Sequence, residues 1–367
     1  MHSQSLINKK IVKNNYKLKT TQKKEKQKYG KGNRKIVKNY LGKVVALSSP
    51  ELIGKELRMS DFTTNITRDE LIGELEKVKI TGMSGNSFFI SEKIKKFCSL
   101  ELDKKILLIN AVECDPGLVH DEWILENRYS EIVHSIYYLK EALGLQDVIM
   151  VSKNKRLETD GSFSLKIVSS RYPMGEEHFL IKQVLGISLE KNEFPVNNGI
   201  LVLNLQSVYQ ICKIINKCYD TGRFITIADL SNGSARVAYV YPTDNISNIL
   251  KSTFKENEDK LLYKGNGVMS CFEATEKDDF SYFGNFAAYS KPSNISNKNK
   301  CKKCGVCTRK CPAKVNISKI VQMIDNNYDV LLSSYHPERC IHCGSCTYYC
   351  KASKNVSEYV MEDYQID

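Results

Sequence analysis

The chain has 367 residues, a net charge of +12, 42% hydrophobic residues and 13 cysteines. Its length allows two or three domains. Thirteen cysteines are too few for a disulfide scaffold in a chain this long, and no stretch reaches the ~18 uninterrupted apolar residues of a membrane span. These properties exclude disulfide-rich secreted proteins and membrane-spanning proteins. We expect a cytoplasmic protein, because clustered thiolates require a reducing compartment.

The positive charge lies almost entirely in residues 1–43, which hold thirteen Lys and Arg34 but only one acid, Glu25. The rest of the chain is therefore close to −1. The segment is rich in Lys, Asn and Gln and has no apolar periodicity, which is typical of a disordered arm. We expect a basic disordered tail over residues 1–45. Such a tail can bind an anionic membrane surface or an acidic protein, or stay solvated without a partner. No nucleic-acid-binding module accompanies it, so nucleic acid is not expected as a partner.

The first predicted helix covers residues 67–78. Thr67 is a good N-cap, and Glu70 stands at the capping-box position three residues later. A loop with Gly82 and Gly85 follows it, and then a second amphipathic segment.

Buried strands and helices alternate after this loop. Short continuous apolar runs predict strands at residues 106–109, 148–151 and 165–168. An apolar stripe predicts a helix over residues 129–143, with Gly144 as its stop. Strands that alternate with helices indicate an α/β domain with a parallel sheet, which we place at residues 67–220.

The pattern changes after residue 220. Residues 224–230 and 235–241 alternate between apolar and polar, and Asn232-Gly233 between them is a strong hairpin turn. A helical segment follows at residues 245–254. A hairpin followed by a helix predicts a small β-grasp-like module over residues 222–262.

Two runs of cysteines near the C-terminus share the spacing C-x-x-C-x-x-C-x-x-x-C. The first run is Cys301, Cys304, Cys307 and Cys311, which Pro312 follows, and the second is Cys340, Cys343, Cys346 and Cys350. This spacing is the ligand set of bacterial-type ferredoxins with two [4Fe–4S] clusters. We therefore predict a two-cluster ferredoxin domain (α+β) at residues 297–355.

The fourth cysteine of each run usually ligates the other cluster. One cluster is thus expected on Cys301, Cys304, Cys307 and Cys350, and the other on Cys340, Cys343, Cys346 and Cys311. Two zinc sites are the alternative, since paired C-x-x-C also binds zinc. A zinc site closes with four ligands, which leaves the third cysteine and the proline of the run without a role.

Four further segments, in this order, together resemble RnfC, the peripheral subunit of Rnf electron-transport complexes, and more distantly the flavin subunit of respiratory complex I. They are Gly82-Met-Ser-Gly-Asn-Ser-Phe88, Asn110-Ala-Val-Glu-Cys-Asp-Pro116, Arg171-Tyr-Pro-Met-Gly-Glu-Glu177 and Leu203-Asn-Leu-Gln-Ser207. The resemblance covers residues 67–355. The basic tail stands where the family has an N-terminal barrel-like domain.

The resemblance implies FMN, a pyridine nucleotide such as NAD(H), and clusters that carry single electrons onward. A flavin is chemically sensible, because hydride delivers two electrons and each cluster accepts one. The positions that match the family's flavin and nucleotide residues are Gly82, Gly85, Lys93, Asn110, Glu113, Asp115, Glu177, Asn204 and Ser207.

The glycine-rich loop departs from the family pattern, which is close to Gly-x-Gly-Gly-Ala-Gly-Phe-Pro. Ser84 and Ser87 replace two of its glycines, and a β-carbon restricts positive φ and close approach to a phosphate. Two interpretations follow. The first is an RnfC-like electron-transfer protein, an NAD(P)H-linked oxidoreductase component on the cytoplasmic face of a membrane complex. The alternative is a ferredoxin-type carrier or a dedicated donor to a catabolic reductase, with the flavin and nucleotide sites lost.

Overall fold

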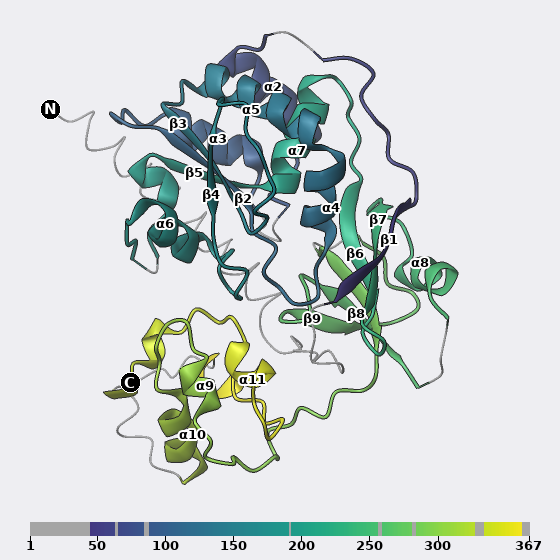
Figure 1. Ribbon diagram of the computed structural model, residues 1–367, viewed down its shortest axis with the longest axis vertical. Helices are drawn as coiled ribbons and strands as arrows, with labels where there is room; N and C mark the ends of the chain where they lie inside the picture. The colour runs from purple at the N-terminus through teal and green to yellow at the C-terminus, as the bar shows by residue number, and fades with distance from the viewer. Residues whose placement is uncertain are drawn as a thin grey trace, which may run out of the picture. The chain divides into compact units, whose positions relative to one another are not determined.

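The computed structural model describes residues 45–62, 65–83, 88–190, 192–255, 259–280, 284–326 and 334–361 (Figure 1). The basic tail predicted over residues 1–45 lies outside these ranges except for Val45. The described residues fall within one compact unit of the chain. None of their helices is long and apolar enough to cross a membrane.

A four-stranded parallel sheet, in the order β4-β3-β2-β5, is the centre of the α/β domain. Its strands are β2 (Ile106–Ala111), β3 (Asp147–Ser152), β4 (Ser164–Ile167) and β5 (Ile200–Asn204). The helices of this domain are α2 (Arg68–Val78), α3 (Ile90–Cys98), α4 (His120–Asn127), α5 (Tyr129–Leu143), α6 (Glu177–Leu185) and α7 (Leu205–Ile215), with a 3₁₀ turn at Pro195–Asn198. The predicted α/β fold with a parallel sheet is confirmed.

Both faces of this sheet are buried, because successive side chains of a strand point to opposite sides. Leu107 and Ile109 of β2 pack into the main core with residues of α2, α3, α5 and α7. Ile106 and Leu108 pack on the other face with residues of α6. Burial on both faces explains why these strands are continuous apolar runs in the sequence.

Local capping signals fix the helix ends at the expected places. The Thr67 side chain accepts the backbone N–H of Glu70, and the Glu70 carboxylate accepts the N–H of Thr67 at 2.8 Å, which completes the capping box. Gly144 ends α5 with a φ of 61°, in the left-handed region that suits glycine.

The second sheet has six strands, in the order β1-β7-β6-β10-β8-β9. Its elements are β1 (Ala46–Ile53), β6 (Arg223–Asp229), β7 (Ser234–Val240), α8 (Ile246–Thr253), β8 (Leu261–Gly265), β9 (Cys271–Ala274) and β10 (Phe286–Ser290). β6 and β7 form the predicted hairpin, α8 follows, and β10 returns parallel to β6 while β8 pairs antiparallel with β10. A hairpin, a helix and a second pair of strands in this order is the β-grasp arrangement.

This sheet is larger than the module expected at residues 222–262, because it also recruits β1 from before the α/β domain and continues to Ser290. The residues of β1 carry no strand signal, since most of them are exposed and the apolar ones do not alternate. The hydrophobic core is also shared with the α/β domain. Phe224 of β6 lies 5.3 Å from Trp123 of α4 and 5.8 Å from Tyr209 of α7, measured between ring centroids.

The cysteine-rich domain consists of short helices that repeat. They are α9 (Val306–Arg309), α10 (Ile317–Asp325), α11 (Ser345–Tyr348) and α12 (Glu358–Met361), with a 3₁₀ turn at Pro337–Arg339. The backbone N–H of Ser318 donates to Thr308 Oγ1 at 2.9 Å, and the N–H of Ser357 donates to Thr347 Oγ1 at 2.7 Å. The repeat visible in the cysteine spacing therefore extends to the hydrogen bonds that hold each half.

Candidate functional site: two cluster cavities and a flavin edge

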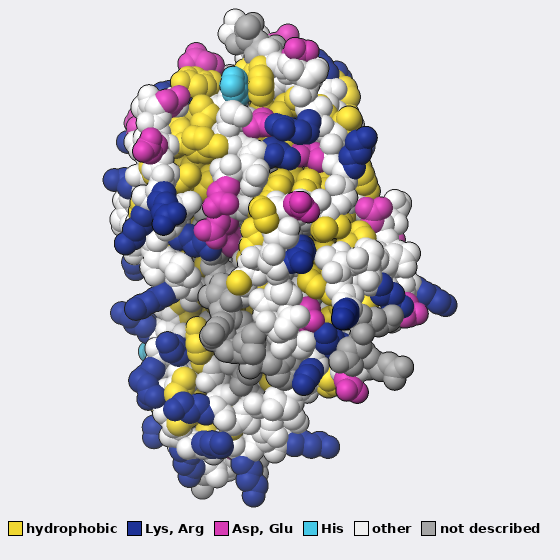
Figure 2. Space-filling model, turned by 45° about the vertical axis from the view of Figure 1, so that its right-hand side comes forward, with side chains coloured by type: hydrophobic (Ala, Val, Ile, Leu, Met, Phe, Trp, Pro, Cys, Tyr) yellow, Lys and Arg dark blue, Asp and Glu magenta, His cyan; other side chains and the backbone are white. Residues whose placement is uncertain are grey.

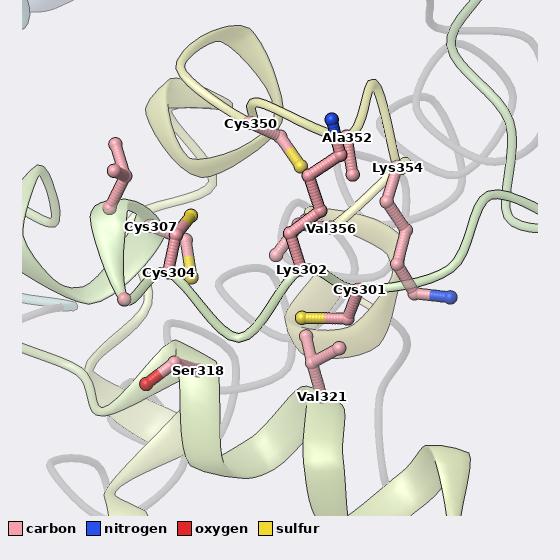
Figure 3. Close-up of a pocket in the computed structure, with 12 residues that line it drawn as sticks. Cys301, Lys302, Cys304, Cys307, Ser318, Val321, Cys350, Ala352, Lys354 and Val356 are labelled. Atoms are coloured by element: carbon pink, nitrogen blue, oxygen red, sulfur yellow. The ribbon is translucent and has the colours of Figure 1, made fainter.

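Two small cavities in the cysteine-rich domain each gather four cysteines. The first is lined by Cys301, Cys304, Cys307 and Cys350, and the second by Cys311, Cys340, Cys343 and Cys346. Figure 3 shows the first, where the sulfurs of Cys301 and Cys350 point toward those of Cys304 and Cys307. In both cavities the fourth cysteine comes from the other run, which is the exchange expected for a two-cluster ferredoxin.

The backbone around the cavities is shaped for clusters. Lys303 and His342, each two residues after the first cysteine of a run, have φ values of 51° and 58°. These turns direct backbone N–H groups at the thiols: Lys303 N–H donates to Cys301 Sγ at 3.3 Å and His342 N–H donates to Cys340 Sγ at 3.4 Å. Hydrogen bonds to the sulfurs are one of the means by which a protein sets a cluster's potential.

The second cavity is the more deeply buried. Cys346 is 6% exposed, whereas its counterpart Cys307 is half-buried and Cys304 is exposed. Burial, and then the neighbouring thiols of Cys343 and Cys340, raise the pKa of Cys346. A buried thiol that resists ionisation alone is deprotonated when it ligates a metal. The donor sets of both cavities thus fit [4Fe–4S] clusters.

Polar residues of the α/β domain gather at the carboxyl ends of β2 and β5, the edge where ligands of parallel sheets bind. Asn110 and Asn204 are direct partners across the two strands. The Asn110 amide donates to the Gly175 carbonyl at 2.8 Å, and Asn204 both caps α7 and donates to Asp121 Oδ2 at 2.9 Å. We call this region the flavin edge, after the resemblance that singled out these residues.

The glycine-rich loop is tied to the flavin edge at Met83. Its N–H donates to Ser207 Oγ at 2.9 Å, and its carbonyl accepts from the Asn285 amide at 2.6 Å. Gly82 donates its N–H to the Phe88 carbonyl across the loop at 2.9 Å. Gly85 lies outside the described residues. Asn285 was not expected from the sequence, because it lies just before β10, far along the chain from every motif.

Lys93 and Glu177 are brought together here. The Lys93 ammonium lies 3.0 Å from Glu177 Oε1 and donates to the Val202 carbonyl at 2.7 Å. An ammonium has three donors, so beyond these two partners it retains a donor for a phosphate. This cation and the amides of Asn110 and Asn204 form a donor set that fits FMN.

The acidic pair of the motif separates into two roles. Glu113 is buried and accepts the N–H of Asp121 at 3.0 Å, and His120 also lies within this buried group. Burial and the nearby Asp121 raise the pKa of Glu113 well above its usual range, so Glu113 is protonated at neutral pH. Neither His120 nor Asp121 was expected from the sequence, and both lie on the first turn of α4.

Asp115, by contrast, holds two segments together. Its carboxylate accepts the N–H groups of Gly117 at 2.8 Å, Val268 at 3.1 Å and Met269 at 3.2 Å. A β-carbon on Gly267, whose φ is 132°, would lie 2.5 Å from this carboxylate, so glycine permits the close approach. In the described structure Asp115 binds the loop before β9, and its predicted cofactor contact stays a prediction.

The loop before α6 contacts the second cluster cavity directly. The Tyr172 hydroxyl donates to the backbone carbonyl of Cys343 at 2.8 Å. Tyr348, in the helix that carries Cys346, packs against the main hydrophobic core. Burial raises the pKa of Tyr348 to about 12, so the phenol stays neutral.

Comparisons with known proteins agree with this geometry. Residues 75–213 match the Nuo51 FMN-binding domain, and residues 300–354 match the 4Fe-4S dicluster domain. The RnfC protein of the ion-translocating oxidoreductase complex of Haemophilus influenzae is 23% identical over 275 residues, which cover 70% of this chain and 33% of that protein. The RnfC protein of Buchnera aphidicola is 24% identical over 310 residues, 78% of this chain and 64% of the relative.

A solved structure has the same fold. The crystal structure of an NAD⁺-reducing [NiFe]-hydrogenase in the H2-reduced state aligns with a TM-score of 0.57 and 11% sequence identity, over 76% of this chain and 60% of that one. The chain spans about a third of the length of the Haemophilus relative named above.

Together the fold, the site and the matched domains define a class of protein that joins an FMN-binding α/β domain to a two-cluster ferredoxin domain. Within that class the chain is RnfC-like, as the Haemophilus and Buchnera relatives show. The predicted resemblance and the predicted cofactor types, FMN and two [4Fe–4S] clusters, are confirmed by these matches.

Proposed function

We propose that the protein is an iron–sulfur electron-transfer subunit of an oxidoreductase complex. Electrons pass between FMN at the flavin edge and the two clusters, and then between the clusters and a partner's redox centre. The hydrogen bond from Tyr172 to the Cys343 carbonyl carries this proposal. Tyr172 belongs to the loop that leads into Glu177, so a loop beside the flavin edge touches a loop that holds a cluster.

The donor and the complex are proposed from the relatives. The RnfC relatives are named as parts of ion-translocating oxidoreductase complexes, and the hydrogenase is named as NAD⁺-reducing. We propose NAD(H) as the two-electron partner of the flavin, which separates a hydride into single electrons. The protein would then act peripherally, on the cytoplasmic face of a membrane electron-transport complex.

Cofactor analysis of anaerobically purified protein tests the proposal. About eight irons and eight sulfides with one FMN, and clusters that bleach when NADH is added, are the expected results. Eight irons without flavin, even after reconstitution with FMN, would overturn the flavin step. The protein would then be a ferredoxin-type relay, the alternative expected from the glycine-rich loop.

The Tyr172→Phe variant tests the route between the two sites. It removes the hydroxyl that binds the Cys343 carbonyl and keeps the ring. We expect unchanged iron and flavin contents but slower reduction of the clusters after the flavin is reduced, measured by stopped-flow absorbance. Tyr349→Phe is the control, since Tyr349 is exposed on the same domain. Equal rates in both variants would show that the hydrogen bond has no part in the transfer.

A further inference from the structure

The first cysteine run lies in a segment with an unusual charge. Between residues 297 and 324 the chain has no Asp or Glu, but it has eight cations: Lys298, Lys300, Lys302, Lys303, Arg309, Lys310, Lys314 and Lys319. All eight are exposed. Lys351, which follows the fourth cysteine of the first cavity, is exposed as well. We call these nine residues the cationic surface. Figure 2 shows Lys and Arg side chains gathered over the lobe that holds the clusters.

These cations surround one cluster rather than both. Lys302 and Lys303 stand between Cys301 and Cys304, and Lys302 lines the first cavity. The equivalent positions of the second run are Ile341 and His342. Positive charge beside a thiolate-ligated cluster favours its reduced form, because net charge tunes the potential. The first cluster is therefore the more favourable place for an electron to reside.

The two cavities also differ in access. Cys304 of the first cavity is exposed, whereas Cys343 and Cys346 of the second are half-buried and buried. The second cavity is partly covered by the protein itself, through the Tyr172 hydrogen bond to Cys343 and the packing of Tyr348. Electron transfer between proteins weakens steeply with distance, so an exposed cluster is the one that exchanges electrons with a partner.

We propose that the cationic surface docks an acidic redox protein, which exchanges electrons with the cluster on Cys301, Cys304, Cys307 and Cys350. The proposal rests on the electron-transfer function above and adds which cluster faces the partner and what charge the partner carries. Complementary charge steers association and raises its rate about 10- to 10³-fold at low salt. A redox protein fits better than an anionic membrane, because the cations flank an exposed cluster ligand and lipid accepts no electrons.

Stopped-flow kinetics with the full-length holoprotein test the docking. The dithionite-reduced protein is mixed at low ionic strength with oxidised flavodoxin, an acidic carrier, and separately with cytochrome c, a basic carrier. The charge-reversal variant K302E/K303E should exchange electrons with flavodoxin at least about tenfold more slowly and with cytochrome c no more slowly. The matched variant K166E/K277E makes the same change in net charge at exposed lysines outside the cluster domain, and its rates should stay within twofold of the original.

The comparison of variants decides the question, because the basic tail of residues 1–43 makes any exchange with an acidic carrier salt-dependent. Equal slowing in the two variants would assign the effect to net charge and overturn the proposal. Binding of phosphatidylserine vesicles that is lost in K302E/K303E, together with unchanged flavodoxin rates, would show a lipid site instead. If K302E/K303E loses iron, K298E/K300E takes its place, since these residues precede the first cysteine.

Methyl viologen separates this proposal from the proposed function. Clusters that exchange electrons readily with methyl viologen but no faster with flavodoxin than with cytochrome c would refute the docking surface alone. Clusters that exchange electrons with none of the three would refute the electron-transfer function itself.

Discussion

Lys213 of α7 is the most instructive residue to change, because its ammonium is fully buried. It lies 2.7 Å from Asp220 Oδ2, 3.1 Å from the Tyr239 hydroxyl and 3.7 Å from Glu56 Oε1. The Lys213 side chain is 0% exposed, and both carboxylates are 2% exposed. These contacts join α7 to β7 and to the segment after β1, so they couple the α/β domain to the β-grasp sheet.

The Lys213→Met variant keeps the length of the side chain and removes its charge. Taking away one partner of a buried ion pair leaves a buried charge uncompensated and costs about 3–5 kcal/mol. A loss of this size lowers the unfolding midpoint by about 6–20 °C for a domain of this size. Thermal unfolding of the anaerobic holoprotein, followed by circular dichroism at pH 7, measures it.

Acid should reduce this deficit. Burial acts to raise the pKa of Asp220, but its hydrogen bonds from Lys213, the Gly222 N–H and Tyr239 outweigh burial and lower the pKa below its usual value. A carboxyl with a lowered folded pKa contributes stability above its unfolded pKa and loses it as the pH falls through the folded value. The original protein therefore loses this contribution in acid, and the two melting curves should converge near pH 4.

Lys217→Met is the matched control. Lys217 follows α7 and pairs with Glu74, but its side chain is 61% exposed, and Glu74 keeps hydrogen bonds from Lys77 and Tyr219. An exposed pair of this kind contributes at most about 1 kcal/mol. If Lys213→Met costs no more than the control, or its deficit is independent of pH, the reasoning on the buried network is wrong.

Two further predictions concern the clusters and a buried acid. The double variant C301S/C350S should retain about half of the iron because both residues line one cavity, whereas C301S/C311S should retain less than half because it damages both cavities; equal iron contents would refute the exchange of cysteines between runs. Glu113→Gln should raise the unfolding midpoint more at pH 8 than at pH 5.5. A raised folded pKa makes Glu113 cost stability as the pH rises through that value, so a gain that is larger in acid would contradict protonation of Glu113.

The parts of the fold that were predicted well depend on residues close together in the chain. The capping box of Thr67 and Glu70, the hairpin at Asn232-Gly233 and the glycine that ends α5 each act over a few residues. The parts that were missed depend on distant partners. β1 is a strand because β7 binds it in parallel, and its own sequence has neither alternation nor a continuous apolar run.

The candidate site divides in the same way. The motifs placed Asn110, Asn204, Lys93 and Glu177 at one edge, because the ends of parallel strands and the loops beside them converge there. Sequence could not show that Asp115 binds backbone N–H groups more than 150 residues away. Nor did any motif indicate that Asn285 holds the glycine-rich loop.

The sequence by itself determined the cluster chemistry, because the cysteine spacing is a local geometric requirement of a [4Fe–4S] cluster and is repeated without change. It also determined the α/β class and the family resemblance. Only the tertiary structure decided that Tyr172 contacts the loop of Cys343 and that the first cluster lies beside exposed lysines. Burial and contact between loops are set by segments far apart in the chain, whereas metal-ligand spacing is set within a single turn of backbone.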